Sequence, residues 1–157
     1  MSNTTEKPEV CDMKRISFTI PGKPFGKQRP RFTKVGTYTK TYTPKETVSY
    51  ENYIKLCYQE AAKGWKFPDD AMLDVRIIAY YEIQKSTSKK KRALMLEHCM
   101  RPGKKPDWDN IGKTICDSLN GIAFHDDAAV VDAQVRKFYS QNPRVDVTIR
   151  RIEEGEL

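Results

Sequence analysis

The stretch K-P-D-W-D-N-I-G-K-T-I-C-D-S-L-N-G, residues 105–121, is the most informative part of this sequence about its fold. Its apolar residues recur every four positions, at Ile111, Ile115 and Leu119. This spacing predicts a helix that begins near Asp109 or Asn110 and packs one face against a core. Asn120-Gly121 follows as a left-handed cap that ends the helix.

The same stretch opens an acidic window in a basic protein. The whole chain has 28 Lys and Arg against 21 Asp and Glu, a net charge of +7. Between residues 107 and 132 the chain nevertheless carries six aspartates and a single cation, Lys113. The aspartates of the window are Asp107, Asp109, Asp117, Asp126, Asp127 and Asp132.

The arrangement of these aspartates indicates a metal site. Asp107 and Asp109 lie two residues apart before the helix, so in an extended chain their side chains point the same way. After the turn that follows the helix, the chain can double back and bring Asp126 or Asp127 against this pair. Carboxylates held together repel one another unless one is protonated or a cation binds. Hard oxygen ligands favour Mg²⁺ or Mn²⁺ over zinc.

Each part of this pattern also has an ordinary structural explanation. Aspartates near helix starts are most often caps, and an Asp-Asp pair in a loop is most often a solvated turn. Trp108 is expected to be a packing anchor rather than a platform on which a base stacks. Asp117 is expected to form a salt bridge with Lys113 rather than to be a fourth metal ligand.

The rest of the chain predicts one α+β domain over residues 14–157, after a flexible tail at 1–13. Strands are expected at 15–20, 73–83, 129–139 and 144–152, the last two as a hairpin. Further helices are expected from Thr43 to about Lys63 and from Ser86 or Ser88 to about Cys99. Residues 21–32 are too rich in Gly and Pro to be regular, and 40–43 form a short extended piece. The order β-α-β-α-α-β-β predicts a mixed sheet with helices packed on it.

Composition narrows the functional classes. The 157 residues contain no run that approaches the roughly 18 apolar residues of a membrane span. The first residues lack the apolar segment of a secretory signal, so a cytoplasmic location is expected. The four cysteines show no paired spacing, which favours reduced thiols over disulfides or a zinc site.

The positive charge is concentrated in segments. Residues 14–45 contain nine cations and no acid, interleaved with aromatic residues. Cations cluster again at 85–92 and at 101–105, just before the acidic window. Such segments suit a polyanion, because cations replace the counterions of phosphates and aromatic rings stack on bases. A highly solvated surface with ordinary lysines is the alternative.

The motifs resemble one known family. K-P-D-W-D-N-I-G-K-T-I-C-D-S-L-N-G, followed by F-H-D-D-A-A-V-V-D-A-Q-V-R-K, is similar to the RusA family of Holliday junction resolvases. The family pattern is D-x-D-N-x-x-K, a helix with a further Asp, a turn, and D-D-x-x-V. The resemblance is strong over about residues 104–137 and looser over the first strand, its P-G-x-P loop and the closing strands. The segment 85–101 looks like an insertion, and no function is assigned to it.

This resemblance implies a Mg²⁺-dependent endodeoxyribonuclease, with Mn²⁺ as a possible substitute, that resolves four-way DNA junctions by paired symmetric nicks in recombination and repair. It also implies a homodimer, and such enzymes often occur in prophages. No membrane and no small-molecule cofactor are expected. By position, Asp107, Asp109 and Asp127 correspond to the metal-binding carboxylates and Lys113 to the catalytic lysine.

The backbone of the junction arms is expected to contact a set of cations: Lys23, Lys27, Arg29, Arg31, Lys104 and Lys105. Pro106 stands where some family members have a basic residue, so Lys104 and Lys105 are expected to replace its phosphate contact. The alternatives are a non-catalytic nucleic-acid-binding protein, and a nuclease that acts on forks or flaps.

Overall fold

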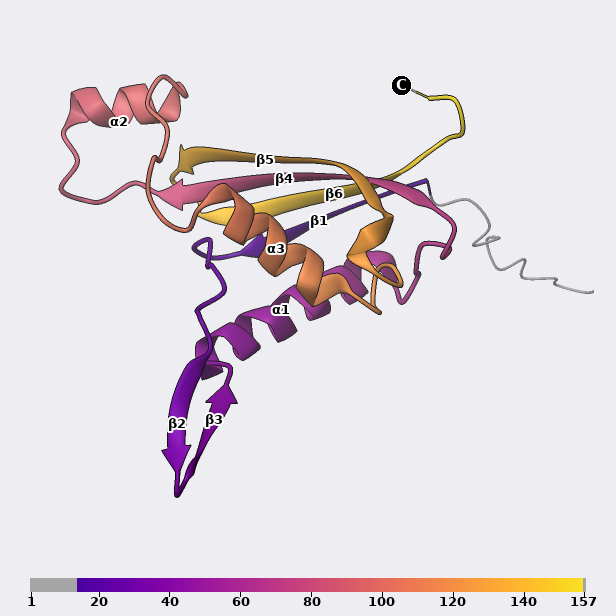
Figure 1. The fold of residues 1–157 in the computed structure, drawn as a ribbon. Helices are drawn as coiled ribbons and strands as arrows, with labels where there is room; N and C mark the ends of the chain where they lie inside the picture. Colours follow the sequence, from indigo (N-terminus) through magenta and orange to yellow (C-terminus); the bar gives the residue numbers. More distant parts are fainter. Residues whose placement is uncertain (1–13, 157) are drawn as a thin grey trace, which may run out of the picture.

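In the computed structural model, which describes residues 14–156, the chain forms an α+β domain with a mixed sheet and three α-helices. Figure 1 shows helices α1 and α3 together on one side of the sheet, and a two-stranded hairpin that projects away from it. No helix of residues 14–156 is long and apolar enough to cross a bilayer. The strands are β1 (Arg15–Pro21), β2 (Arg31–Val35), β3 (Tyr38–Tyr42), β4 (Met72–Glu82), β5 (Val130–Ser140) and β6 (Arg144–Ile152). The helices are α1 (Lys45–Ala62), α2 (Lys89–Leu96), α3 (Trp108–Leu119) and a 3-10 turn, η1 (Asp127–Ala129).

The main sheet has the order β1-β6-β4-β5. β4 is parallel to β5 and antiparallel to β6, so Ile77 of β4 lies between Val135 and Val147. The predicted hairpin of the last two strands is therefore wrong, because β4 lies between them. β4 is the longest apolar strand, and a central position lets it pair along both edges.

The core lies between the sheet and the two helices α1 and α3. Ile54 and Tyr58 of α1 and Ile111 and Ile115 of α3 are fully buried there. Tyr58 meets Phe18 of β1 edge to face, with 5.6 Å between ring centroids. The four-residue spacing that predicted α3 is confirmed, and it explains why the opposite flank of this helix is free to carry polar side chains.

The two-stranded hairpin β2–β3 was not predicted. Its residues are all exposed, including Phe32 and Tyr38 at 72% and 65%. Gly36, with φ of 63°, provides the left-handed residue of the two-residue turn between Val35 and Tyr38. The sequence signal was the alternation of β-branched and aromatic residues around this glycine.

The helix boundaries differ from the prediction in small ways. Pro44, not Thr43, occupies the N-cap position of α1, and no side chain caps that helix. The Ser88 side chain caps α2, as expected, by accepting a hydrogen bond from the Lys91 backbone N–H. Trp108 is 66% exposed at the start of α3, so its interpretation as a packing anchor is wrong. It is the first residue of α3 and comes before Ile111, where the buried stripe of the helix begins, so its ring remains in solvent.

Candidate functional site

The N-terminus of α3 presents two carboxylates that have no protein partner in the described chain. Asp107 is the N-cap residue, with φ −68° and ψ 157°, and its carbonyl oxygen accepts from the Ile111 N–H. Its carboxylate makes no capping hydrogen bond, and Asp109 lies in the first turn. The explanation of Asp107 as a side-chain cap is therefore not supported. Both carboxylates remain available for a ligand.

Residues from β4 and β5 hold the turn that leads to Asp107. The Tyr81 hydroxyl donates to the Pro106 carbonyl oxygen at 2.6 Å, and the Lys137 ammonium donates to the Lys104 carbonyl oxygen at 2.5 Å. Burial raises the pKa of Tyr81, and the negative charge of Asp107 raises it further. Burial lowers the pKa of Lys137, while Asp107 opposes that shift. Sequence reasoning missed both residues, although Lys137 ends the V-R-K run of the motif.

The loop between β1 and β2 docks on α3 through the side chain of Asn110. The Lys27 backbone N–H donates to Asn110 Oδ1 and to Thr114 Oγ1, both at 3.0 Å. In return, Asn110 Nδ2 donates to the Lys27 carbonyl oxygen at 3.2 Å. Gly26 lies so close that a Cβ atom there would be 2.8 Å from Pro106 Cβ. The amide of Asn110 thus fixes one wall of the site to the helix that carries the carboxylates.

A groove of about 1140 Å³ forms between this loop and the start of α3. It brings together most of the predicted site residues: Asp107, Asp109, Lys113, Lys27, Arg29, Arg31 and Lys105. Lys23 and Lys104 line a neighbouring hollow of about 280 Å³, which Lys105 and Pro106 share with the main groove. Acidic and basic residues that are far apart in the sequence therefore line one surface.

Two of the cations already have partners. The Lys27 ammonium lies 3.4 Å from the Asp117 carboxylate and 3.7 Å from that of Glu51, and its side chain is only 33% exposed. The predicted salt bridge between Asp117 and Lys113 is therefore wrong, because Lys27 takes that place. Lys23 pairs with Glu82 at 2.7 Å on an exposed surface. Lys113 has no ion pair within residues 14–156 and lines the groove.

Asp127 lies apart from the first carboxylate pair. It begins η1, and it does not line the groove. A hydrogen bond with Asp126 is the main cause that raises the pKa of Asp127, and the charge of Asp117 adds to the effect. The Asp126 carboxylate also accepts from the Ala128 N–H at 3.1 Å. In the described part of the chain, no three His, Cys, Asp or Glu side chains are grouped so that they could hold one metal ion.

A groove that combines two unpaired carboxylates with several cations suits chemistry on a phosphodiester of a polyanion. Comparison with known proteins agrees with this class. The model of the family described as endodeoxyribonuclease RusA matches residues 21–150, and the chain belongs to this family of endodeoxyribonucleases. YqaN of Bacillus subtilis, described as an uncharacterized protein, is 33% identical over 137 residues, which cover 87% of this chain and 96% of YqaN.

Proposed function

We propose that the protein is a Mg²⁺-dependent endodeoxyribonuclease that resolves four-way DNA junctions by paired symmetric nicks. The observation that carries the proposal is the groove in which Asp107, Asp109 and Lys113 lie beside Arg29, Arg31 and Lys105. Carboxylates suited to a divalent cation and cations suited to phosphate thus line one surface. Membership of the RusA family supports the junction as the substrate.

The donor set fits a magnesium ion. Mg²⁺ is commonly bound through one or two carboxylates, with water and substrate phosphate as its other ligands. Asp107 and Asp109 provide two carboxylates without competing hydrogen bonds or ion pairs in residues 14–156. Bound there, the ion would supply a Lewis acid for the scissile phosphate and lower the pKa of a water molecule.

Asp127 is the third ligand in this proposal. Because it is not grouped with the first pair, the assignment requires η1 to approach the start of α3 when metal and DNA bind. Asp126 would remain the capping residue of η1, since its carboxylate accepts the Ala128 N–H. A ligand role for Asp127 predicts that Asp127→Asn loses cleavage at unchanged stability.

The cations of the chain have distinct roles in the proposed reaction. Lys113 lines the groove one turn after Asp109 and would stabilise the negative charge that develops on the phosphate. Arg29, Arg31, Lys104 and Lys105 would bind the DNA backbone, together with Lys23 once it leaves the exposed pair with Glu82. Lys27 contributes chiefly by holding the loop, because its ammonium is already engaged by Asp117 and Glu51.

Two symmetric nicks require two centres, so we propose a homodimer whose two-fold axis matches that of the junction. A monomeric enzyme would release singly nicked junctions. Sedimentation at the concentrations used for cleavage, together with the fraction of junctions cut in both strands, tests this part of the proposal.

The deciding experiment compares Asp109→Asn with Asp132→Asn. Both remove one carboxylate from the acidic window, but Asp132 lies on β5 and outside the groove. With Mg²⁺ and a labelled four-way junction, Asp109→Asn should bind and not cut, whereas Asp132→Asn should cut at the parental rate. Cutting by Asp109→Asn at the parental rate would overturn the metal assignment. Fork, flap and duplex substrates in the same assay test the alternative nucleases, and binding without cutting by the unaltered protein would identify a non-catalytic binder.

A further inference from the structure

The segment between β4 and the acidic turn is a second basic element. Residues 85–92 carry five cations, and residues 84–96 contain no acid. Four of the cations are exposed lysines without an ion pair in residues 14–156: Lys85, Lys89, Lys90 and Lys91. None of these lysines lines the groove already described.

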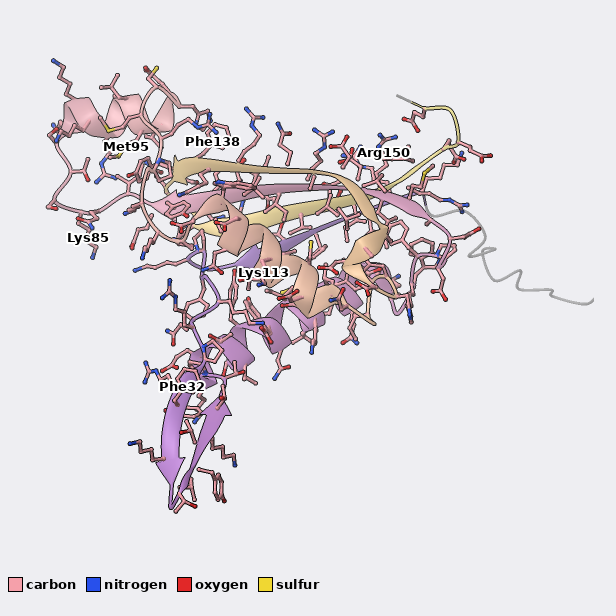
Figure 2. The ribbon with its side chains drawn as sticks, in the orientation of Figure 1. Phe32, Lys85, Met95, Lys113, Phe138 and Arg150 are labelled. Carbon is pink, nitrogen blue, oxygen red and sulfur yellow. The ribbon has the colours of Figure 1, made fainter. Side chains whose placement is uncertain are left out.

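This element is anchored to the domain rather than loosely attached. Arg92 Nη2 donates to the Gln84 carbonyl oxygen at 3.2 Å, and Arg101 Nε donates to that of Lys137 at 2.9 Å. The Arg101 guanidinium lies 4.1 Å from the centroid of the Phe138 ring, and the His98 ring packs on the same phenylalanine at 4.6 Å. In Figure 2, Phe138 lies at the end of β5 beneath α2. The segment that carries these lysines is therefore held in a fixed position on the domain.

The basic element and the nuclease groove lie on the same end of the molecule. The chain runs from α2 through Lys104 and Lys105 directly to Asp107, and Lys137 fixes this connection by donating to the Lys104 carbonyl oxygen. Figure 1 shows the start of α3 between α2 on one side and the β2–β3 hairpin on the other. Arg31, the first residue of β2, lines the groove from the hairpin side.

The stability of α2 does not account for the lysines at its start. Positive charges in the first turn of a helix repel the positive end of the helix dipole, and α2 has no acid there to offset them. A membrane surface does not explain them either, because a helix that lies on lipid needs an apolar face. On α2 the half-buried Leu94 and Met95 face the domain, and Leu96 is its single large exposed apolar residue, at 41%.

We infer that α2 binds backbone phosphates of the DNA on the opposite side of the cleaved bond from the β2–β3 hairpin. The inference rests on the proposed nuclease function and adds a partner surface to it. Together with the hairpin, α2 would hold the substrate on both flanks of the carboxylate pair. The contacts would be electrostatic and independent of sequence, because the lysines offer charge without a fixed geometry.

The test compares Lys90→Gln/Lys91→Gln with Lys63→Gln/Lys66→Gln, in an Asp109→Asn background so that the junction stays intact. Lys63 and Lys66 are also exposed and follow α1, whose end lies far from α2 (Figure 1). Two lost phosphate contacts should reduce the slope of log affinity against log salt by about 1.8 and weaken binding roughly tenfold or more at 0.1 M salt. The control pair should change neither quantity.

Footprinting decides the side of the contact. Hydroxyl-radical protection should disappear on one flank of the cleaved bond for Lys90→Gln/Lys91→Gln and on the other flank for Arg31→Gln, which alters the first residue of the hairpin. With Asp109 restored, the single-turnover rate at saturating protein should stay unchanged while the half-saturating concentration rises. Behaviour identical to the control pair, or loss of protection on the same flank as Arg31→Gln, would overturn the inference. If the unaltered protein neither binds nor cuts junctions, the proposed function itself fails.

Discussion

Replacing Gly26 with alanine should disturb the site without altering any charged residue. A Cβ atom at this position would lie 2.7 Å from Asn110 Nδ2 and 2.8 Å from Pro106 Cβ. Neither neighbour can yield easily, because Pro106 is a rigid ring and Asn110 is held by hydrogen bonds to both backbone groups of Lys27. The loop must therefore move away from α3, which changes the width of the groove between them.

The expected magnitude follows from these contacts. Overpacking of this kind costs about 1–3 kcal/mol, and each weakened neutral hydrogen bond adds about 1 kcal/mol. These terms overlap, so we expect the free energy of unfolding to fall by about 2–3 kcal/mol. For a domain of this size, that corresponds to a Tm lower by roughly 4–12 °C. A displacement of about 1 Å at a catalytic site can cost 10²-fold in rate, so cleavage should fall more steeply than binding.

Gly103→Ala is the matched control. A Cβ atom at Gly103 would meet nothing within 4 Å, and this glycine lies outside the left-handed backbone region. Its replacement should be neutral or stabilise by about 0.4–1 kcal/mol. Thermal melts and single-turnover junction cleavage measure both variants. If Gly26→Ala melted and cut like Gly103→Ala, the docking of the loop on Asn110 would not be what shapes the site.

Three further predictions concern the same surface. Because Trp108 is 66% exposed, Trp108→Ala should cost less than about 2 kcal/mol of stability and yet weaken junction cleavage; normal cleavage would show that no base stacks there. Lys27→Gln should lower the free energy of unfolding by about 1 kcal/mol and leave the salt dependence of binding unchanged, because its side chain serves Asp117 and Glu51. Arg29→Gln should leave the free energy of unfolding unchanged and reduce the salt dependence of binding. Urea unfolding and salt titrations of binding measure the two quantities. Chelation with EDTA should abolish cleavage while binding persists, and cleavage that survives EDTA would contradict a metal-dependent reaction.

Local patterns predicted the parts of the fold that local forces determine. The spacing of Ile111, Ile115 and Leu119 defined α3 because a helix buries one stripe of its surface. The apolar run of β4 was recognised as a strand for a similar reason. The position of β4 between β5 and β6 was not predicted, since strand pairing is a non-local choice that neither strand reveals by itself. The short loop between β5 and β6 suggested a hairpin, which the central position of β4 excludes.

Site residues were predictable where chemistry and spacing coincide. The D-x-D pair and Lys113 are visible in the sequence, and the structure brings them to one groove. Tyr81 and Lys137 were missed because each acts on the backbone of the acidic turn from a strand distant in the sequence. Likewise, the charge of Lys27 was evident, but its ion pairs with Asp117 and Glu51 were not predicted. These partners lie on two separate helices, far from the basic segment in the sequence.

Which charges are paired, rather than how many there are, therefore explains how a basic protein can use an acidic window. Lys27 is engaged by Asp117 and Glu51, so its charge is offset within the domain. Arg29 and Arg31 have no carboxylate partner within residues 14–156, although they share a groove with Asp107 and Asp109. Had these residues neutralised one another, neither phosphate nor metal would find a free ligand. Because they remain separate, the proposed reaction would let a DNA phosphate reach the arginines, and a divalent cation held by Asp107 and Asp109 would reduce the repulsion between their carboxylates and the phosphate.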